Sequence, residues 1–128
     1  MAPTVKEPPQ EFDATVETLI VGAGACGLIA ALSAAEAGQE VLVIEADAVP
    51  SGSTALSAGL IPAAGTKIQQ AAGIEDSTAL FAADIQAKAH QENNQALVDL
   101  LAQNAAEVID WLTQTHGLAF SLVDDFDY

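Results

Sequence analysis

Residues 22–27 read Gly-Ala-Gly-Ala-Cys-Gly, which is the spacing of a turn that binds the diphosphate of a nucleotide. The first glycine permits a tight turn, the second lets the backbone approach a pyrophosphate, and the third lets a helix pack closely on a strand. The anion would lie at the helix start, where unpaired N–H groups and a dipole end of about +0.5 charge favour it. On its own the motif is weak, because an alanine-rich helix start can produce it by accident.

The elements around this turn are those that nucleotide binding requires. Residues 16–21 are β-prone and stop at the turn, residues 25–37 favour a helix that Gly38 would end, and residues 41–44 favour a second buried strand. Together they predict a right-handed βαβ unit. Glu45 follows the second strand, eighteen residues past the last glycine, where a carboxylate can accept hydrogen bonds from a ribose diol. The same acid would repel the 2′-phosphate of NADP. The plainer alternative is a βαβ unit whose glycines serve turn geometry only.

Downstream of Glu45 the pattern changes. Residues 46–65 are rich in small residues and lack periodicity, which indicates a segment that approaches something closely. Helices are then predicted over residues 66–72, 78–90 and 95–115, with Asp76 or Ser77 capping the second, and a final strand over residues 118–123. The third helix carries an apolar stripe, on which Trp111 is expected to lie in the core; its members are Leu97, Leu100, Leu101, Val108, Trp111 and Leu112.

Composition narrows the classes of partner. The chain has 128 residues, three lysines and no arginine, and a net charge of −15. Such a surface repels nucleic acid and anionic lipid, whereas a phosphate-bearing ligand can still bind to backbone N–H groups. A single cysteine excludes an intrachain disulfide framework. No apolar run reaches the roughly 18 residues of a membrane span, and the polar start does not read as a signal peptide, so we expect a cytoplasmic chain without membrane insertion.

The other groups that could do chemistry have more ordinary interpretations. Cys26 is a small residue at a helix start, and without a second cysteine it cannot form a redox pair. His90 and His116 lie near predicted helix ends, where a cation is favourable. The aspartates of residues 124–127 indicate a solvated acidic end rather than a metal site. We therefore expect no catalytic residue and no metal site in this chain.

The segment after the second strand resembles the second cofactor-contacting stretch of the fumarate reductase/succinate dehydrogenase flavoprotein family. In that family an acid at the strand end precedes G-G-x-T-x-x-(S/A)-(G/A)-G, and residues 51–59 read Ser-Gly-Ser-Thr-Ala-Leu-Ser-Ala-Gly. The similarity continues through residues 72–77 and 106–112, so it covers about residues 16–123. It implies an α/β fold, a Rossmann-like βαβ FAD-binding domain with an incomplete parallel sheet, followed by a helical segment.

Composition and the resemblance together predict how the chain is divided. Residues 1–15 are polar and contain prolines, so they would be a flexible leader. Residues 16–65 would be the βαβ dinucleotide-binding unit with its FAD-contacting loop, and residues 66–128 a helical continuation of the same domain.

Carried over residue by residue, the family's FAD contacts fall on two stretches and one acid. The pyrophosphate contacts would be Gly22, Gly24, Ala25, Cys26 and Gly27. Glu45 would bind the adenosine ribose, and the residues that contact pyrophosphate, ribitol or flavin would be Ser53, Thr54, Ala58 and Gly59. Membrane-bound members attach FAD covalently through a histidine at the position of Ser53, so FAD is expected to be non-covalent here. Ser51 and Ala58 stand where glycines are usual.

The activity implied by the resemblance is that of a flavin-dependent oxidoreductase of the fumarate reductase type, with hydride transfer between flavin N5 and a C=C or CH–CH group beside a carbonyl. Family members use an arginine as proton donor and bind dicarboxylate with histidine, threonine and arginine. Those elements lie beyond the position that matches Tyr128, so the chain is expected to be an amino-terminal portion, inactive alone, with FAD as its ligand and a substrate only in an intact parent. The alternatives are a 3-ketosteroid dehydrogenase-type flavoprotein, a truncated non-catalytic fragment, and an NAD-binding regulatory module.

Overall fold

A computed structural model describes residues 11–123 of the chain. The chain divides into two compact units, Met1–Leu60 and Ile61–Tyr128, and each is considered by itself. Most of the predicted leader and the acidic residues 124–127 lie outside the described residues.

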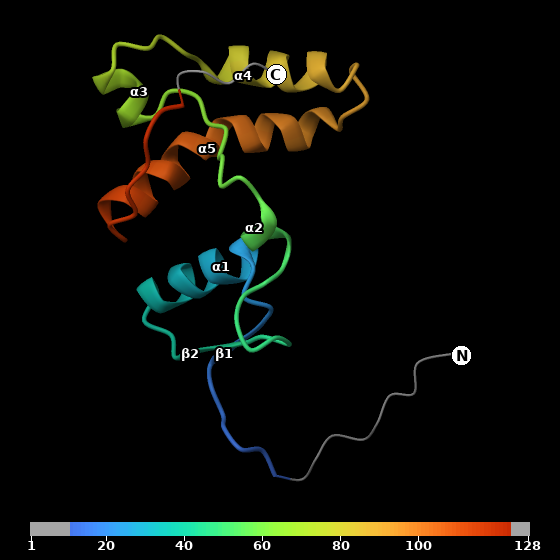
Figure 1. Cartoon of the computed structure of the whole chain (residues 1–128), viewed down its shortest axis with the longest axis vertical. Coiled ribbons are helices and arrows are strands. Elements are labelled where there is room, and N and C mark those ends of the chain that lie inside the picture. The colour runs from blue at the N-terminus through green and yellow to red at the C-terminus, as the bar shows by residue number, and fades with distance from the viewer. Residues whose placement is uncertain (1–10, 124–128) are drawn as a thin grey trace. The chain divides into compact units, whose positions relative to one another are not determined.

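The first unit is a βαβ element with an α/β fold, as the sequence predicts (Figure 1). Strand β1 (Thr18–Val21) and strand β2 (Val41–Ile44) pair in parallel, with Thr18 opposite Val41 and Val21 opposite Ile44. Helix α1 (Ala25–Glu36) connects them and contacts both strands. The helix ends where expected, because Gly38 adopts φ +82° and donates its N–H to the Ala35 carbonyl at 3.0 Å.

Only one face of the two-stranded sheet is covered. Ile20 and Val43 pair across the strands and are half-buried, and a methyl carbon of Ile20 lies close to Gly27 in α1, so this face packs on the helix. The opposite face, here called the open sheet face, consists of the exposed side chains of Leu19, Val21, Leu42 and Ile44. Strands made only of aliphatic residues are typical of sheets that are buried on both faces. In this unit only one face is buried.

A short helix lies within the segment for which no regular element is predicted. Helix α2 (Ser53–Leu56) begins after Gly52, which has an extended backbone and contributes no capping side chain. Its second residue, Thr54, contacts the start of α1. A helix this short has little stability of its own, so this contact with another element helps to explain why it forms.

The second unit contains three helices, α3 (Lys67–Ala71), α4 (Thr78–Lys88) and α5 (Gln95–Gln114). Each begins with a side-chain cap. Thr66 and Gln69 form a reciprocal capping box at α3, in which the Gln69 N–H donates to Thr66 Oγ1 at 3.2 Å and the Thr66 N–H to Gln69 Oε1 at 2.9 Å. Of the two predicted caps for α4 the structure uses Ser77, whose Oγ accepts the Leu80 N–H at 3.1 Å. Asn94 caps α5.

Helices α4 and α5 run side by side (Figure 1). Most of the small apolar core of this unit is supplied by α5. The buried apolar residues are Ala64, Val98, Ala102, Ile109 and Leu112. Gln86 of α4 is also buried, and its amide nitrogen donates to Gln95 Oε1 at 2.9 Å and to the Asn93 carbonyl at 3.3 Å, which ties the end of α4 to the start of α5.

Most of the apolar stripe predicted on α5 is exposed. Of its members, Leu112 is buried and Trp111 is half-buried, whereas Leu97 and Leu100 are 64% and 60% exposed. The helix carries apolar residues on two faces, and the face through Val98 and Ile109 takes the core position. The other face lines an apolar groove of about 480 Å³, formed by Ile61, Pro62, Leu97, Leu100, Leu101 and Val108.

The predicted final strand is also wrong, because residues 118–123 adopt no regular structure. The second unit offers no strand edge within its described residues, so β-prone side chains have nothing to pair with. After Gly117, which ends α5 with φ +68°, the Leu118 N–H donates to the Leu112 carbonyl at 3.1 Å. The start of this segment is therefore hydrogen-bonded to the end of α5.

Candidate cofactor-binding site

The turn between β1 and α1 is built on Gly22. Its backbone has φ +103°, a conformation that residues with a Cβ rarely adopt, and its N–H donates to the Ile44 carbonyl at 2.7 Å. The turn therefore remains tied to the end of β2 while the chain reverses into α1.

Gly27 permits the close packing of α1 on this turn. A Cβ added at Gly27 would stand 2.0 Å from the Gly22 carbonyl oxygen and 3.2 Å from a methyl carbon of Ile20. The contact with the carbonyl oxygen is shorter than side chains tolerate, and it is with backbone, which cannot rotate away, whereas the contact with Ile20 is only tight. Only glycine fits at this position without moving the turn.

Gly24 leaves open space at the helix start. It has an ordinary backbone (φ −77°), and a Cβ added there would meet only Thr54 Oγ1, at 3.6 Å. It is the N-terminal flanking residue of α1, and no side chain of its own caps the helix. A ligand could therefore come close to the backbone here, as the sequence pattern predicts.

The N–H groups of this turn fall into two sets. Those of Ala23 and Ala25 donate to Glu45 Oε2 at 2.7 Å and to Thr54 Oγ1 at 3.0 Å. For the N–H groups of Gly24, Cys26 and Gly27, residues 11–123 supply no acceptor. Unpaired N–H groups at the start of a twelve-residue helix are suited to an anion, so these residues fit the diphosphate of a nucleotide.

The Glu45 carboxylate lies against the turn, as the sequence pattern predicts. Its Oε2 accepts from Ala23, and its Oε1 accepts the N–H groups of Ala46 at 2.7 Å and Asp47 at 3.4 Å. These backbone donors, Ala23 first, hold the pKa of Glu45 below its usual range because they stabilise the charged form. The side chain is exposed, so its remaining lone pairs are accessible to a ribose hydroxyl.

The second predicted stretch reaches the turn through one side chain. Thr54 contacts Ala25, whereas no hydrogen bond joins Ser53 or Ala58 to the turn in the described part of the chain. Gly59 is linked to Thr54 indirectly, because Ser57 Oγ donates to the Thr54 carbonyl at 2.8 Å and accepts the Gly59 N–H at 3.2 Å.

The structure thus brings together residues 22–27, Glu45 and Thr54, whereas among the described residues no hydrogen bond joins Ser53 or Ala58 to the turn. Two residues that support the site were not predicted, Ala23 and Ser57. Ala23 contributes only its backbone, which carries no sequence signal. Ser57 lies within the family-like stretch, and its spacing of three residues from Thr54 could have indicated a local hydrogen bond.

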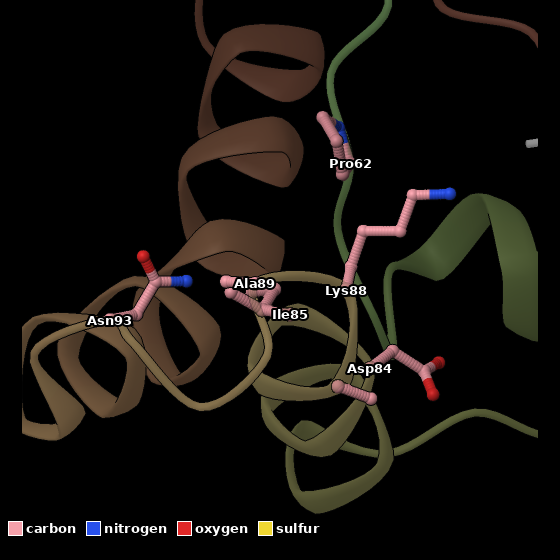
Figure 2. Close-up of a pocket in the computed structure, with 7 residues that line it drawn as sticks. Pro62, Asp84, Ile85, Lys88, Ala89 and Asn93 are labelled. Atoms are coloured by element: carbon pink, nitrogen blue, oxygen red, sulfur yellow. The ribbon is translucent and has the colours of Figure 1, made fainter.

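A separate hollow of about 840 Å³ lies in the second unit (Figure 2). Its lining is mostly aliphatic, with Pro62, Ile85 and Ala89 among the labelled residues. Asp84 and Lys88 contribute opposite charges one turn apart on α4, which is a common surface arrangement. This hollow lacks the convergent backbone donors of the glycine turn, so it is not the better cofactor site.

Two further findings concern the described residues alone. Between residues 11 and 123 no three His, Cys, Asp or Glu side chains are grouped so that they could hold a metal ion. None of the helices in this range is long and apolar enough to cross a membrane.

Comparison with known proteins defines the class. The family model described as "FAD binding domain" matches residues 17–126. A probable fumarate reductase of Shewanella frigidimarina is 38% identical over 98 residues, which are 77% of this chain and 17% of that protein. The open conformation of a flavocytochrome c3 fumarate reductase superposes with a TM-score of 0.70 at 37% identity, covering 78% of this chain and 18% of that one. A 3-ketosteroid-Δ4-(5α)-dehydrogenase from Rhodococcus jostii RHA1 superposes with a TM-score of 0.72 at 30% identity, covering 81% and 22%.

The chain belongs to the FAD binding domain family, and the family resemblance predicted from the sequence is confirmed. It spans about a fifth of the length of the relatives that it matches.

Proposed function

We propose that this chain binds FAD non-covalently at the glycine turn and is the cofactor-binding portion of a flavin-dependent oxidoreductase of the fumarate reductase type. The observation that carries the proposal is the set of three N–H groups, on Gly24, Cys26 and Gly27, that have no acceptor in residues 11–123. They lie at the start of α1 in a chain that belongs to the FAD binding domain family.

In this proposal each residue of the site has a defined task. The three N–H groups and the dipole of α1 bind the pyrophosphate without a side-chain cation, which a chain without arginine requires. Glu45 accepts a hydrogen bond from the adenosine ribose while it continues to fix the turn through Ala23. Ser53 replaces the histidine of covalently flavinylated members, and it offers no side chain for such a bond.

The reaction is a proposal for the whole protein. Bound FAD supplies hydride exchange at N5 with a C=C or CH–CH group beside a carbonyl. Our chain contributes binding and orientation of the cofactor. Substrate contacts and the proton donor belong to parts outside these residues, since the chain spans about a fifth of its relatives. The isolated chain is therefore inactive in this proposal.

A 3-ketosteroid dehydrogenase type is the second candidate, because the Rhodococcus enzyme superposes as well as the fumarate reductase does. In both candidates the residues of this chain bind FAD. They differ in the substrate that a full-length parent would reduce or dehydrogenate, so assays of that parent with fumarate and with a 3-ketosteroid separate them.

The net charge of −15 supports the further proposal that neither nucleic acid nor a lipid surface is a partner. A single exposed cysteine is compatible with a reducing compartment, and we propose the cytoplasm.

The test is a titration of the purified chain with FAD, followed by quenching of flavin fluorescence. We expect saturable quenching, competition by ADP, and no binding of riboflavin, since the site recognises the diphosphate and ribose. Fumarate reduction with a reduced dye should be absent. If the chain is folded, as judged by circular dichroism, and binds neither FAD nor ADP, the proposal is overturned. It is also overturned if NAD raises the melting temperature of the chain and FAD does not.

A further inference from the structure

A hollow of about 390 Å³ in the second unit is lined by residues of α4, of α5 and of the turn that joins them. On α4 its wall begins with Ala79, Ala82 and Ala83, which recur at helical spacing on one face and leave space because they carry only methyl groups. The other lining side chains are polar. They are Gln86, Gln91, Gln95 and Asp99, and the feature is here called the glutamine hollow.

Gln86 is the buried member of this set, with 5% of its surface exposed. Its Nε2 donates to the Asn93 carbonyl at 3.3 Å and to Gln95 Oε1 at 2.9 Å. A carbonyl oxygen can only accept, so the contact with Asn93 fixes which end of the Gln86 amide is the nitrogen. Both hydrogens of that nitrogen are therefore used within the protein.

The orientation of the Gln95 amide is fixed in the same way. Its Nε2 donates to Asp99 Oδ1 at 2.8 Å, and a carboxylate oxygen is an acceptor. The hydrogen bonds therefore run in one direction, from Gln86 through Gln95 to Asp99. At the beginning of this series Gln86 Oε1 is a buried acceptor that has no donor within residues 11–123. Buried polar atoms are nearly always paired, so this oxygen indicates a donor that those residues do not supply.

The electrostatics of the hollow favour a cation as that donor. The described residues that line it include the half-buried carboxylate of Asp99 and no lysine or histidine. Gln95 donates to only one of the two carboxylate oxygens, so lone pairs of Asp99 are accessible to a second partner. The hollow thus combines two acceptors, held apart by the Gln95 amide, with a wall of methyl groups.

We propose that the glutamine hollow binds a guanidinium group on a short alkyl chain, which pairs with the Asp99 carboxylate and donates one N–H to Gln86 Oε1. A guanidinium has five N–H donors in a planar fork, so a single ion can reach two separated acceptors, whereas an ammonium group is a compact point charge. It is also more weakly hydrated than an ammonium, which lowers the cost of placing it beside the alanines. Because Gln86 Oε1 is buried, the exposed side chain of Gln91 must turn aside as the ligand enters.

The experiment measures the dissociation constant of the full 128-residue chain for propylguanidinium, at a constant ionic strength of about 0.15 M so that general attraction to the acidic chain is screened. Binding is followed by NMR through the side-chain amide signals of the glutamines. Asp99→Asn keeps an oxygen for Gln95 and removes the charge, so it should weaken binding about 10- to 100-fold. Glu107→Gln is the matched control, because it removes one exposed carboxylate from the same helix outside the hollow, and its effect should be less than about twofold.

Two comparison ions test the chemistry of recognition. Propylammonium should bind more weakly than propylguanidinium, and tetramethylammonium, which has the charge but no N–H donor, should not shift the Gln86 amide signal at all. The proposal is supported if both orders hold and the Gln86 signal moves saturably.

Three results would overturn the inference. Equal binding of tetramethylammonium would show attraction by net charge alone. Equal losses in folded D99N and E107Q chains would show that the cation lies elsewhere on the acidic surface. If propylguanidinium leaves the Gln86 signal unmoved, Gln86 Oε1 is paired with water only. The binding of FAD at the glycine turn does not depend on any of these outcomes.

Discussion

Two glycines of the turn have different roles: Gly27 is needed for stability and Gly24 for ligand binding. An alanine substitution at each position tests this. Gly27→Ala places a Cβ 2.0 Å from the Gly22 carbonyl oxygen, where the usual separation of such atoms exceeds 3 Å. The backbone of the turn or the helix must therefore move by about 1 Å. Overpacking commonly costs about 1–3 kcal/mol, and the rigid backbone on both sides predicts the upper end of that range.

Gly24→Ala should behave in the opposite way. Its Cβ would meet only Thr54 Oγ1 at an ordinary 3.6 Å, and its φ of −77° suits alanine. Gly24 is the N-cap of α1, where alanine is less favourable than glycine, so stability should fall by no more than about 1 kcal/mol. The methyl group would, however, occupy the space beside the backbone where we propose that pyrophosphate binds. Affinity for FAD should fall while the fold remains.

The assay combines thermal unfolding followed by circular dichroism with FAD titration of each variant. Gly52→Ala is the stability control, because Gly52 has φ −72° and nothing within 4 Å of an added Cβ. G27A should lose stability and FAD binding together, whereas G24A should lose binding with little loss of stability. The reasoning is refuted if G27A unfolds like wild type, or if G24A binds FAD with unchanged affinity.

Four further predictions follow from single features. Thr66→Ala removes the capping box of α3 and should cost about 1 kcal/mol in the free energy of unfolding, measured with urea; no change would refute the role of the box. Leu112→Ala, at a site 4% exposed, should cost about 2–5 kcal/mol, whereas Leu101→Ala, 53% exposed, should cost under about 1 kcal/mol; equal costs would contradict the assigned core. The backbone donors of Glu45, Ala23 first, lower its pKa below the ordinary value of a glutamate, so its stabilising effect is present at neutral pH and is lost as the pH falls through the lowered pKa. The difference in melting temperature between wild type and Glu45→Gln should vanish in that acid range, and a constant difference would exclude this cause. Raising ionic strength from about 0.01 M to 0.15 M shortens the screening length from about 30 Å to 8 Å and should strengthen FAD binding, because a chain of net charge −15 repels a dianion; weaker binding would show that side-chain cations dominate.

Most of the local structure could be predicted because its signals are local. The helix predicted over residues 95–115 is observed at Gln95–Gln114, and the one predicted over residues 25–37 at Ala25–Glu36, since glycines at 38 and 117 stop each helix with positive φ. The position of Glu45 beside the turn also follows from strand length and spacing. In these cases residues near in sequence settle the outcome.

The remainder depends on contacts between distant residues. Helix α2 forms where its sequence shows no periodicity, and Thr54 joins it to Ala25, 29 residues away. The strand predicted over residues 118–123 does not form, because the described part of the second unit has no strand with which it could pair. The α5 pattern correctly marks apolar residues, but it cannot indicate which of two apolar faces will be covered. For the candidate site, the sequence predicts the residues at the turn but not that Glu45 and Thr54 take two of its N–H groups.

The open sheet face has a consequence for handling the isolated chain. Each of the two strands pairs only with the other, so within residues 11–123 both outer edges present free backbone donors and acceptors next to Leu19, Val21, Leu42 and Ile44. Exposed edges with aliphatic side chains are templates for strand addition and fibril growth. Mutual repulsion between chains of charge −15 opposes this self-assembly, and added electrolyte weakens that repulsion. A concentrated solution of the chain should therefore stay clear in buffer of low ionic strength and become turbid when salt is added. Binding measurements are accordingly best made at low protein concentration.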